Sequence, residues 1–490
     1  MKPITLHEVA KACCGTLHGD PELKITSIVT DSRKAGEGSL FAAIKGARVD
    51  GHRFIPAVAE QGAVCVLCEE KPDIDINYIR VDSTLVALKG IAEYYRSLFT
   101  IPFIGITGSV GKTSTKEFIS AVLAQKYNVH KTGGNFNNEL GVPITLFGLE
   151  EEHEVAVIEM GISGFGEMTR LSKMVKPDIS VITNIGYCHL ENLGDRDGVL
   201  RAKTEMFRYL KKDGTIILCH DDDKLRTVTD YHGIRPIFYG TGNDEYRAEN
   251  ITEKGLDGIG CTLIHGLSRD ESRSIDAIPQ SPDGDSLLAG SGSPSVATRR
   301  LPNGEHLYQR EPEMRIDVTI PTMGRHNVLN ALCAMAVGTQ LGLSADEIKR
   351  GLESFENVGS RNHIIKTDTL TIIDDCYNAN PTSTKAGLDT LSKLSGRRIA
   401  VLGDMKELGK DELALHREVG AYAKKVGIDM LVAVGPLSEA TAEGYGEGAY
   451  YAATVERCID RIKRYLQPGD TVLVKASHSM QFERIVEALS

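Results

Sequence analysis

A glycine-rich turn between an apolar strand and a helix constrains the fold of this chain more than any other feature. Residues 103–106 are apolar, Gly108 and Gly111 follow, and a helical pattern runs over 114–125. Glycines let the backbone N–H groups of such a turn point inward, and the helix N-terminus adds positive potential. The spacing is shorter than in the strict G-x-x-x-x-G-K-[ST] pattern, because Ile106 stands where that pattern has glycine. The turn predicts a phosphate-binding loop in a parallel α/β sheet.

The side chains of this loop suit a nucleoside triphosphate and its cation. Lys112 offers a point charge to the β- and γ-phosphates, and the Thr113 hydroxyl suits Mg²⁺. A turn without a ligand is the alternative, and the order strand, Gly-Lys-Thr, helix argues against it. The predicted ATP contacts within the loop are Thr107, Gly108, Ser109, Val110, Gly111, Lys112 and Thr113.

The chain divides into three stretches, as its 490 residues lead one to expect. Residues 1–84 hold short apolar runs broken by Pro and Gly, which predicts a small mixed α/β domain. Over 85–325 apolar runs alternate with helical stretches, as in a parallel sheet covered on both faces. Residues 326–490 repeat this alternation and predict a Rossmann-like domain. The Gly-, Ser- and Pro-rich residues 266–312 predict a flexible surface insertion in the central domain.

The composition argues against several classes of function. A formal net charge of -11 disfavours a broad nucleic-acid surface or a polybasic membrane footprint. No run of about 18 apolar residues is present, and charged residues follow the start too soon for a signal peptide. Ten cysteines spread along the chain are typical of a reduced protein. We therefore expect a cytoplasmic protein without nucleic-acid or membrane partners.

Three further side chains are candidates for the same site. Glu159 ends the apolar run 155–158, and His189 follows the run 179–182. The carboxyl ends of parallel strands meet at one edge of a sheet, where a carboxylate can hold Mg²⁺. For His189 a structural role is equally open. Lys203 opens a helix, and residue physics alone favours a solvated lysine, because an ammonium does not ligate a cation.

Several motifs in fixed order resemble those of the Mur ligase family, ATP-dependent enzymes that add amino acids to the cytoplasmic peptidoglycan precursor. The phosphate loop 107–113, the T-x-G-N-x-N-N-x-x-G-x-P run at 132–143 and the G-x-H-N-x-x-N-A element at 324–331 look like family elements. The runs D-D-x-Y-N-A-N-P at 374–381 and G-D-M-x-E-L-G at 403–409 resemble one branch. That branch joins D-alanyl-D-alanine to UDP-N-acetylmuramoyl-tripeptide. The resemblance covers nearly the whole chain.

The resemblance implies an ATP-dependent peptide ligase of three domains. In the family a substrate carboxylate attacks the γ-phosphate of ATP, and the incoming amine then displaces phosphate from the acyl phosphate. The resemblance further implies that CO₂ carbamoylates Lys203, which makes it an anionic ligand, and that two Mg²⁺ sites exist. The implied catalytic residues are Lys112, Lys203, His189 and Glu159, and the implied metal ligands are Thr113, Glu159, His189 and Lys203.

The resemblance also assigns binding residues in all three domains. It implies ATP contacts for Asn330, Arg361 and Asp375, at the seam between the second and third domains. Its partners are UDP-N-acetylmuramoyl-tripeptide, D-alanyl-D-alanine and ATP, and we expect a monomer that closes during turnover. The implied substrate contacts are Ser32, Arg33, Lys45, Gly46, Asp50, His52, Thr132, Asn135, Asn138, Tyr377 and Asn380.

The sequence also departs from the family, and other functions stay open. Ala476 and His478 replace Gly and Arg of a K-G-S-R-x-M run, which puts an anion contact at 478 in doubt. Another Mur ligase, or a ligase like folylpolyglutamate synthetase, shares the acyl-phosphate chemistry, but the latter lacks a domain like residues 1–84. A non-catalytic phosphate-loop protein would not need Glu159, His189 and Lys203 together.

Overall fold

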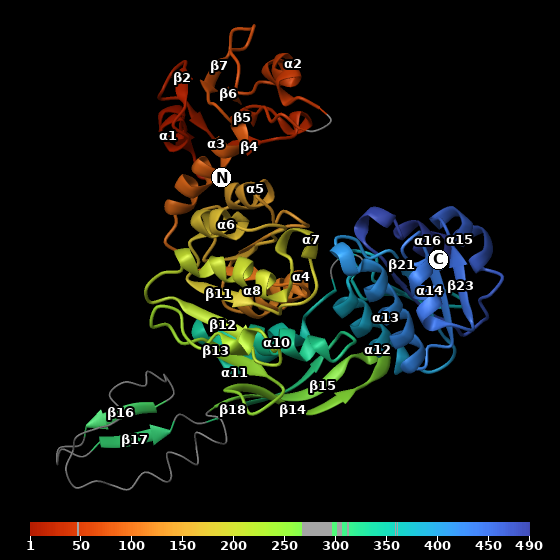
Figure 1. The fold of residues 1–490 in the computed structure, drawn as a ribbon. Helices are drawn as coiled ribbons and strands as arrows, with labels where there is room; N and C mark the ends of the chain where they lie inside the picture. The colour runs from red at the N-terminus through yellow and green to blue at the C-terminus, as the bar shows by residue number, and fades with distance from the viewer. Residues whose placement is uncertain (47–48, 267–295, 301–305, 311–312, 358, 360) are drawn as a thin grey trace.

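The computed structural model describes residues 1–46, 49–266, 296–300, 306–310, 313–357, 359 and 361–490 (Figure 1). Three sheets carry the architecture of these residues, and they follow one another along the chain. Figure 1 shows them as an N-terminal part in red and orange, a central part in yellow and green, and a C-terminal part in blue. The three-domain α/β fold expected from the sequence is confirmed.

The N-terminal sheet is small and mixed, with the order β2-β7-β6-β5-β4. Strands β4 to β7 run parallel, β2 runs antiparallel to β7, and β1 pairs separately with β3. Its strands are β1 (Ile4–Thr5), β2 (Thr16–His18), β3 (Lys24–Ile25), β4 (Ser27–Val29), β5 (Ser39–Ala42), β6 (Cys65–Cys68) and β7 (Asn77–Arg80). Its helices are α1 (Leu6–Ala12), η1 (Ser32–Lys34), η2 (Gly51–Phe54) and α2 (Ile55–Glu60).

Helix α3 (Thr84–Ser97) joins this sheet to the central part of the chain. Ser83 caps the helix by accepting from the Val86 amide. Buried residues of α3 face both sides, because the helix packs on α1 and also on the central helices α5 and α6. This packing makes α3 the connection between the two sheets.

The central sheet has nine strands among the described residues, in the order β18-β15-β14-β13-β12-β11-β8-β10-β9. Its strands are β8 (Phe103–Thr107), β9 (Val129–Lys131), β10 (Val155–Glu159), β11 (Ile179–Ile182), β12 (Thr215–Cys219), β13 (Ile237–Gly240), β14 (Tyr246–Glu253), β15 (Ile259–His265) and β18 (Met314–Ile320). Its helices are α4 (Lys112–Leu123), α5 (Gly141–Phe147), α6 (Glu167–Val175), α7 (Leu190–Leu193), α8 (Arg196–Thr204), α10 (His326–Gln340) and α11 (Ala345–Glu353), with short helices η3 (Glu205–Tyr209), η4 (Leu225–Thr227) and η5 (Gly255–Asp257).

The sequence predicts a parallel central sheet, but the observed sheet is only partly parallel. Neighbouring strands from β9 to β14 are parallel, but β15 and β18 extend one edge in antiparallel pairing. Strand β18 alternates buried and more exposed residues, whereas β8, β10 and β11 are buried throughout. Strands that are buried on both faces have continuous apolar runs and are easily recognised in the sequence. A half-buried strand such as β18 has no such run, so this criterion does not predict it.

Helices α10 and α11 pack on the central sheet, although the expected boundary at 325/326 assigns them to the C-terminal domain. Helix α10 contacts α4 and strands β12 to β15, and its apolar residues belong to the central hydrophobic core. Phe355, just after α11, stacks on Phe118 of α4 with ring centroids 3.7 Å apart. The packing therefore favours a boundary between the central and C-terminal domains after residue 355. The order of helices and strands in the sequence does not show to which domain α10 and α11 belong.

The C-terminal sheet has the order β19-β20-β24-β21-β22-β23, parallel except for β19. Its strands are β19 (His363–Lys366), β20 (Thr371–Asp374), β21 (Arg398–Gly403), β22 (Met430–Val434), β23 (Ala449–Ala452) and β24 (Thr471–Lys475). Its helices are α12 (Pro381–Ser392), η6 (Gly409–Asp411), α13 (Glu412–Lys425), α14 (Glu439–Tyr445), α15 (Val455–Ile462), η7 (His478–Met480) and α16 (Glu483–Leu489).

The insertion predicted at 266–312 lies mostly outside the described residues, so its flexibility stays a prediction. Within it, β16 (Val296–Arg300) pairs antiparallel with β17 (His306–Arg310). Across the part of the chain that the structure describes, no helix combines the length and apolar character needed to cross a membrane.

Candidate active site

The phosphate loop joins β8 to α4 through two glycines whose conformation other residues rarely adopt. Gly111 has φ +78° and precedes the first residue of α4. Gly108 has φ +155°, and a Cβ there would lie 1.9 Å from the Oγ1 atom of Thr183. The loop therefore needs glycine at 108 both for its backbone angle and for the close approach of Thr183.

The segment after β11 braces this loop from the side. The Asn184 carbonyl accepts from the Ser109 amide at 3.0 Å, and its side-chain Oδ1 accepts from the Val110 amide at 2.9 Å. The Thr183 hydroxyl donates to the Val110 carbonyl at 2.6 Å. Sequence reasoning missed Thr183 and Asn184, although they directly follow a predicted strand of the same sheet.

Two lysine ammonium groups converge on one backbone carbonyl in the loop. Lys112 Nζ donates to the Gly108 oxygen at 2.8 Å, and Lys203 Nζ donates to the same oxygen at 3.1 Å. Lys203 is only 1% exposed, so the solvated lysine that residue physics favours is wrong. Burial, opposed by Cys188 and reinforced by the Lys112 charge, lowers the pKa of Lys203 to about 8. Burial therefore makes the neutral form of this amine more accessible than that of a solvated lysine.

Glu159, the last residue of β10, lies beside the phosphate loop and is almost fully buried. Its Oε2 accepts from the Thr113 hydroxyl at 2.8 Å, and its Oε1 accepts from the Asn137 amide at 2.7 Å. The Thr132 hydroxyl accepts from the Glu159 backbone N–H at 2.9 Å. Glu159, Thr113 and Thr132 thus lie together, while the metal-ligand role of Glu159 and Thr113 and the substrate contact of Thr132 stay predictions. Asn137 was missed, although it lies in the same N-x-N-N run as Asn135 and Asn138.

His189 stands between the central and C-terminal sheets. It precedes α7 with a left-handed φ of +51°, and its Nδ1 lies 2.5 Å from Glu407 Oε2. The contact with His189 lowers the pKa of Glu407. Glu407 belongs to the G-D-M-x-E-L-G run, and sequence reasoning did not select it.

The residues around the loop fit a divalent cation once one more anionic ligand is supplied. The described residues hold no group of three or more His, Cys, Asp or Glu side chains placed for a metal. Glu159, His189 and the Thr113 hydroxyl are suitable donors, but two ammonium groups outweigh the single carboxylate. The buried Thr107 hydroxyl finds no hydrogen-bond partner among the described residues, which is consistent with a ligand at the loop. A carbamate on Lys203 would remove one positive charge and add oxygen donors.

The residues expected to contact ATP outside the phosphate loop lie on two parts of the chain, and their roles stay predictions. Asn330 accepts from the Thr115 hydroxyl at 2.8 Å, in the first turn of α4. In the C-terminal sheet, Asp375 accepts from Lys475 Nζ at 2.6 Å. The Arg361 guanidinium carbon lies 3.8 Å from the ring centre of Tyr377. Lys475 is a further residue that sequence reasoning did not select.

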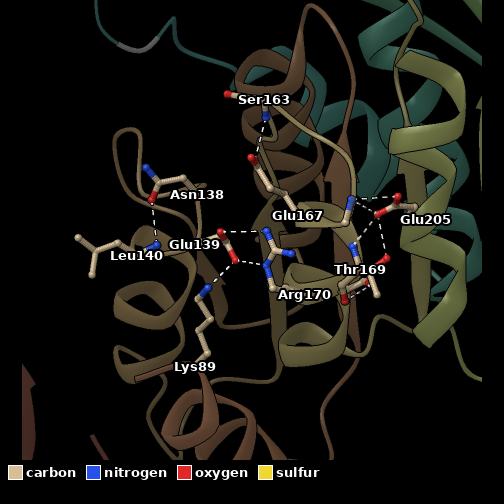
Figure 2. Close-up of polar contacts among 11 residues, drawn as sticks. Lys89, Asn138, Glu139, Leu140, Ser163, Glu167, Thr169, Arg170 and Glu205 are labelled. Carbon is tan, nitrogen blue, oxygen red and sulfur yellow. Dashed lines mark hydrogen bonds and ion pairs between the residues drawn. The ribbon is translucent and has the colours of Figure 1, made fainter. Parts of the chain in front are cut away.

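Ion pairs and hydrogen bonds hold the loop over 132–141 in place (Figure 2). Glu139 accepts from Lys89 Nζ and from Arg170 Nε, each at 2.5 Å, and so ties the loop to α3 and α6. Asn138 Oδ1 accepts from the Leu140 amide at 3.1 Å, so this side chain shapes its own turn. Asn135 is exposed. Substrate contacts of Asn135 and Asn138 remain predictions.

Of the six expected contacts in the N-terminal sheet, two line a pocket of about 500 Å³. These are Ser32 and Arg33 of η1, whereas Lys45, Gly46, Asp50 and His52 are not among its lining residues. Both ring nitrogens of His52 are engaged: Nδ1 lies 2.7 Å from Asp50 Oδ1, and Nε2 accepts from the Glu69 amide. Asp50 therefore caps its own turn, and His52 links that turn to the residue after β6, while a substrate role for both stays a prediction.

The residues expected on the dipeptide side have local partners. Asn380 caps α12, where its Oδ1 accepts from the Ser383 amide at 2.9 Å. His478, the departure from the family pattern, has its ring centre 5.8 Å from that of Tyr377. An aromatic group thus stands at 478 where the family places an arginine.

The comparisons with known proteins cover the chain from end to end. Three family descriptions match in order: Mur ligase family, catalytic domain, over residues 24–98; Mur ligase middle domain over 106–268; and Mur ligase, glutamate ligase domain, over 360–478. UDP-N-acetylmuramoyl-tripeptide–D-alanyl-D-alanine ligase of Bacillus subtilis (strain 168) is 35% identical over 500 residues, covering 99% of this chain and 98% of its own.

Solved structures give the same picture. The crystal structure I of MurF from Acinetobacter baumannii has a TM-score of 0.85 at 30% identity, covering 100% of this chain and 99% of its own. The MurF ligase of Thermotoga maritima, crystallised in complex with ADP, has a TM-score of 0.77 at 25% identity, covering 94% and 96%. The chain therefore belongs to the Mur ligase family, and it is an ATP-dependent ligase of peptidoglycan-precursor synthesis. Within the family, the relatives that match it along nearly their whole length are named for the UDP-N-acetylmuramoyl-tripeptide and D-alanyl-D-alanine that they join.

Proposed function

We propose that this protein joins D-alanyl-D-alanine to UDP-N-acetylmuramoyl-tripeptide at the expense of ATP, and that it does so in the cytoplasm. The product is the UDP-N-acetylmuramoyl-pentapeptide. The observation that carries the proposal is the convergence of Lys112 and Lys203 on the Gly108 carbonyl, with Glu159 bonded to Thr113 beside them. Such a site gathers the charges that phosphoryl transfer between two anions requires.

The chain's own residues supply positioning and charge for each step. The amides of the phosphate loop and Lys112 hold the triphosphate, while the tripeptide carboxylate attacks the γ-phosphorus and the bond to ADP breaks. The amine of the dipeptide then attacks the acyl carbon and loses a proton, and phosphate leaves as the amide forms. Bound Mg²⁺ would neutralise phosphate charge, held by Thr113, Glu159, His189 and a modified Lys203.

Lys203 is proposed to carry a carbamate. Its neutral amine attacks the carbon of CO₂, a nitrogen–carbon bond forms, and one proton leaves to solvent, so that an anionic carboxylate remains. Deep burial and a pKa of about 8 favour the neutral amine that this reaction needs. The modification also explains why a lysine stands among the proposed cation ligands, because a carbamate has oxygens that bind a cation and an ammonium group has none.

Replacement of Lys203 tests the carbamate. Lys203→Ala is expected to abolish ligation, and short carboxylic acids such as acetate are expected to restore part of it by occupying the vacated space. ADP release at increasing acetate concentration measures this rescue. Lys112→Ala is the control, since an added anion does not replace a cation that binds phosphate. A fully active Lys203→Ala protein would remove the carbamate from the proposal.

The substrates are tested by ADP release against a matrix of UDP-muramoyl peptides and amines. We expect D-alanyl-D-alanine with a tripeptide acceptor to give the fastest turnover. A preference for a single amino acid would point to another step of the same family. Preference for glutamate with a folate acceptor would indicate a folylpolyglutamate synthetase, and ATP binding without any turnover would indicate a non-catalytic protein.

A further inference from the structure

We infer that Lys116 and Glu139 hold the two ends of the loop 132–141 and thereby position its exposed tip, residues 133–136, for the acceptor, the UDP-N-acetylmuramoyl peptide. The inference rests on the proposed function, because it takes the acceptor to bind at this tip. It assigns Lys116 and Glu139 as positioning residues, which act through the loop and contact neither ATP nor the acceptor.

The tip of the loop is open to a ligand. Residues 133–136 are exposed, and a Cβ added to Gly133 or Gly134 would meet nothing within 4 Å. The backbone N–H groups of Gly133, Gly134 and Asn135 donate to no atom of the residues that the structure describes. Oxygen atoms of a ligand can therefore accept from them without displacing a bond of the protein.

The tip also lies next to the phosphate loop. Asn137, directly after the tip, donates to Glu159 Oε1 at 2.7 Å, and Glu159 Oε2 accepts from the Thr113 hydroxyl at 2.8 Å. Two hydrogen bonds thus connect the tip to the residue that follows Lys112. An acceptor held at the tip is close to a triphosphate held by the phosphate loop, as a reaction between the two requires.

Lys116 fixes the start of the loop to helix α4. Its side chain is almost fully buried, and Nζ donates to the Thr132 carbonyl at 2.7 Å. The buried Glu117 lies 3.0 Å from the same Nζ and accepts from Lys131 at 2.5 Å. Burial raises the pKa of Glu117, but the hydrogen bond from Lys131 and the charge of Lys116 outweigh burial and lower the pKa overall. An ionised carboxylate therefore accompanies the ammonium group that bonds the loop.

Lys116 also closes a ring of contacts between α4, the end of β10 and the loop. The Thr132 hydroxyl accepts from the Glu159 backbone N–H at 2.9 Å, and Glu159 bonds Thr113. Thr113 and Lys116 are three positions apart in α4, so their side chains lie on the same face of the helix. Desolvation largely cancels the attraction within a buried ion pair, so the net stability gained here is small. The effect of Lys116 is therefore expected on the position of the loop.

Glu139 holds the other end of the loop, as Figure 2 shows. Oε1 accepts from Lys89 Nζ of α3 and from Arg170 Nε of α6, each at 2.5 Å, and Oε2 accepts from a second nitrogen of Arg170 at 3.2 Å. Burial raises the pKa of Glu139, but the bonds from Arg170 and Lys89 outweigh burial and lower the pKa overall. Because α3 also packs on the N-terminal sheet's helix α1, Glu139 fixes the loop relative to the substrate contacts predicted in that sheet.

Steady-state kinetics of the full chain test the inference through a KM that a purely structural role would not change selectively. Glu139→Gln is expected to raise the KM for UDP-N-acetylmuramoyl-tripeptide by about five-fold, the upper range for a partly exposed ion pair. The reason is that a loop in the binding position for only part of the time weakens binding by that fraction. The KM for ATP is expected to stay unchanged, because Asn184 and Thr183 brace the phosphate loop separately.

Glu93→Gln is the matched control for Glu139→Gln. Glu93 of α3 also pairs with two cations, Lys173 and Lys176, and its side chain is 26% exposed against 27% for Glu139. It does not touch the loop 132–141 in any contact among the described residues. Glu93→Gln is therefore expected to keep both KM values of the unmodified protein.

Lys116→Met tests the other end of the loop. The variant keeps an unbranched side chain of similar length and is expected to raise the KM for the acceptor by about ten-fold, because a charge-assisted hydrogen bond is lost. Lys126→Met is its control, since Lys126 Nζ donates to the Gly342 carbonyl at the same 2.7 Å on the surface. Thermal unfolding shows which variants keep the fold. If Lys116→Met does not fold, Glu139→Gln decides the outcome, because it replaces a partly exposed group by one of the same shape.

The outcomes separate this inference from the proposed function. If the unmodified protein gives no turnover with UDP-N-acetylmuramoyl-tripeptide, the proposed function fails and the inference fails with it. If turnover occurs but Glu139→Gln has the KM values of Glu93→Gln, the proposed function stands and the positioning role is overturned. Equal rises in the KM for ATP and for the acceptor overturn it as well. A rise in the KM for the acceptor alone supports the role.

Discussion

The carbonyl of Gly108 accepts from two ammonium groups, Lys112 and Lys203, at 2.8 and 3.1 Å. Like charges that share one acceptor in a buried setting raise each other's free energy, and an anionic ligand would relieve this. The loop is therefore poised for phosphate and for a change in the charge of Lys203. The sequence showed the glycines and Lys112, because their spacing follows a pattern. It did not show that Lys203 is buried, because burial depends on the packing of α8 against the loop.

Gly108→Ala is expected to weaken ATP binding by about ten-fold or more, the effect of losing one charge-assisted hydrogen bond. The added Cβ would displace Thr183, whose hydroxyl bonds the Val110 carbonyl and holds the loop in place. Calorimetric titration with a non-hydrolysable ATP analogue measures the change. Gly242→Ala is the control, since a Cβ there meets its nearest neighbour at 3.5 Å. Equal affinities of the two variants would contradict the account of the loop.

Lys475→Met is expected to destabilise the protein by about 3 kcal/mol, because it leaves the carboxylate of Asp375 without its buried partner. The Lys475 side chain is only 3% exposed and bonds Asp375 at 2.6 Å. Lys385→Met is a matched control, since Lys385 bonds Glu418 at the same 2.6 Å at the surface. Its expected cost is below about 1 kcal/mol. Urea unfolding measures both, and similar costs would argue against a special role for burial at Lys475.

At the scale of elements, the sequence predicts best the strands that are buried on both faces. Strands β8, β10 and β11 lie within one residue of their expected ranges, because continuous apolar runs leave little alternative. The helix expected to open near Lys203 instead begins at Arg196, capped by Asp195, and continues as the 3-10 helix η3. The cap was overlooked because the apolar pattern starts later than the helix does.

His130 of β9 gives the central part of the chain a predictable response to acid. Its Nε2 lies 2.7 Å from the Thr145 carbonyl of α5, and burial lowers the pKa of His130 from 6.5 to about 4. The unfolded chain then binds a proton that the folded chain does not, so stability is complete above pH 6.5 and falls as the pH drops towards 4. The loss attributable to this residue is at most about 3 kcal/mol.

His130→Gln keeps a side-chain donor for Thr145 and removes the titrating ring. The variant is expected to lose less stability than the unmodified protein between pH 7 and about pH 4.5. Urea midpoints at a series of pH values measure the difference, with the exposed His7→Gln as a control. Parallel pH profiles for all three proteins would show that His130 does not cause the acid sensitivity.

At the scale of the whole molecule, the sequence predicts three domains but not where their surfaces meet. Asn330 and Glu407 show why. Asn330 contacts Thr115 because α10 packs on α4, and Glu407 contacts His189 because two loops more than 200 residues apart come together. No local pattern encodes such contacts, since each depends on packing between elements distant in the chain. Asn330 was predicted only through its family motif, and Glu407 was not selected even with one.

The interface between the central and C-terminal parts can be followed because the chain contains no tryptophan. Thr382, at the start of α12, lies 3.1 Å from where a Cβ of Gly186 would stand. Thr382→Trp therefore places a single fluorophore between the two parts. Domain closure on the nucleotide excludes water from such a place. We expect a blue shift of its emission, and weaker quenching by acrylamide, when an ATP analogue and UDP-N-acetylmuramoyl-tripeptide are both bound. Tyr450→Trp, on the outer strand β23, is the control and should respond to neither. If both reporters respond alike, closure does not occur at the interface formed by α7, α12 and η6.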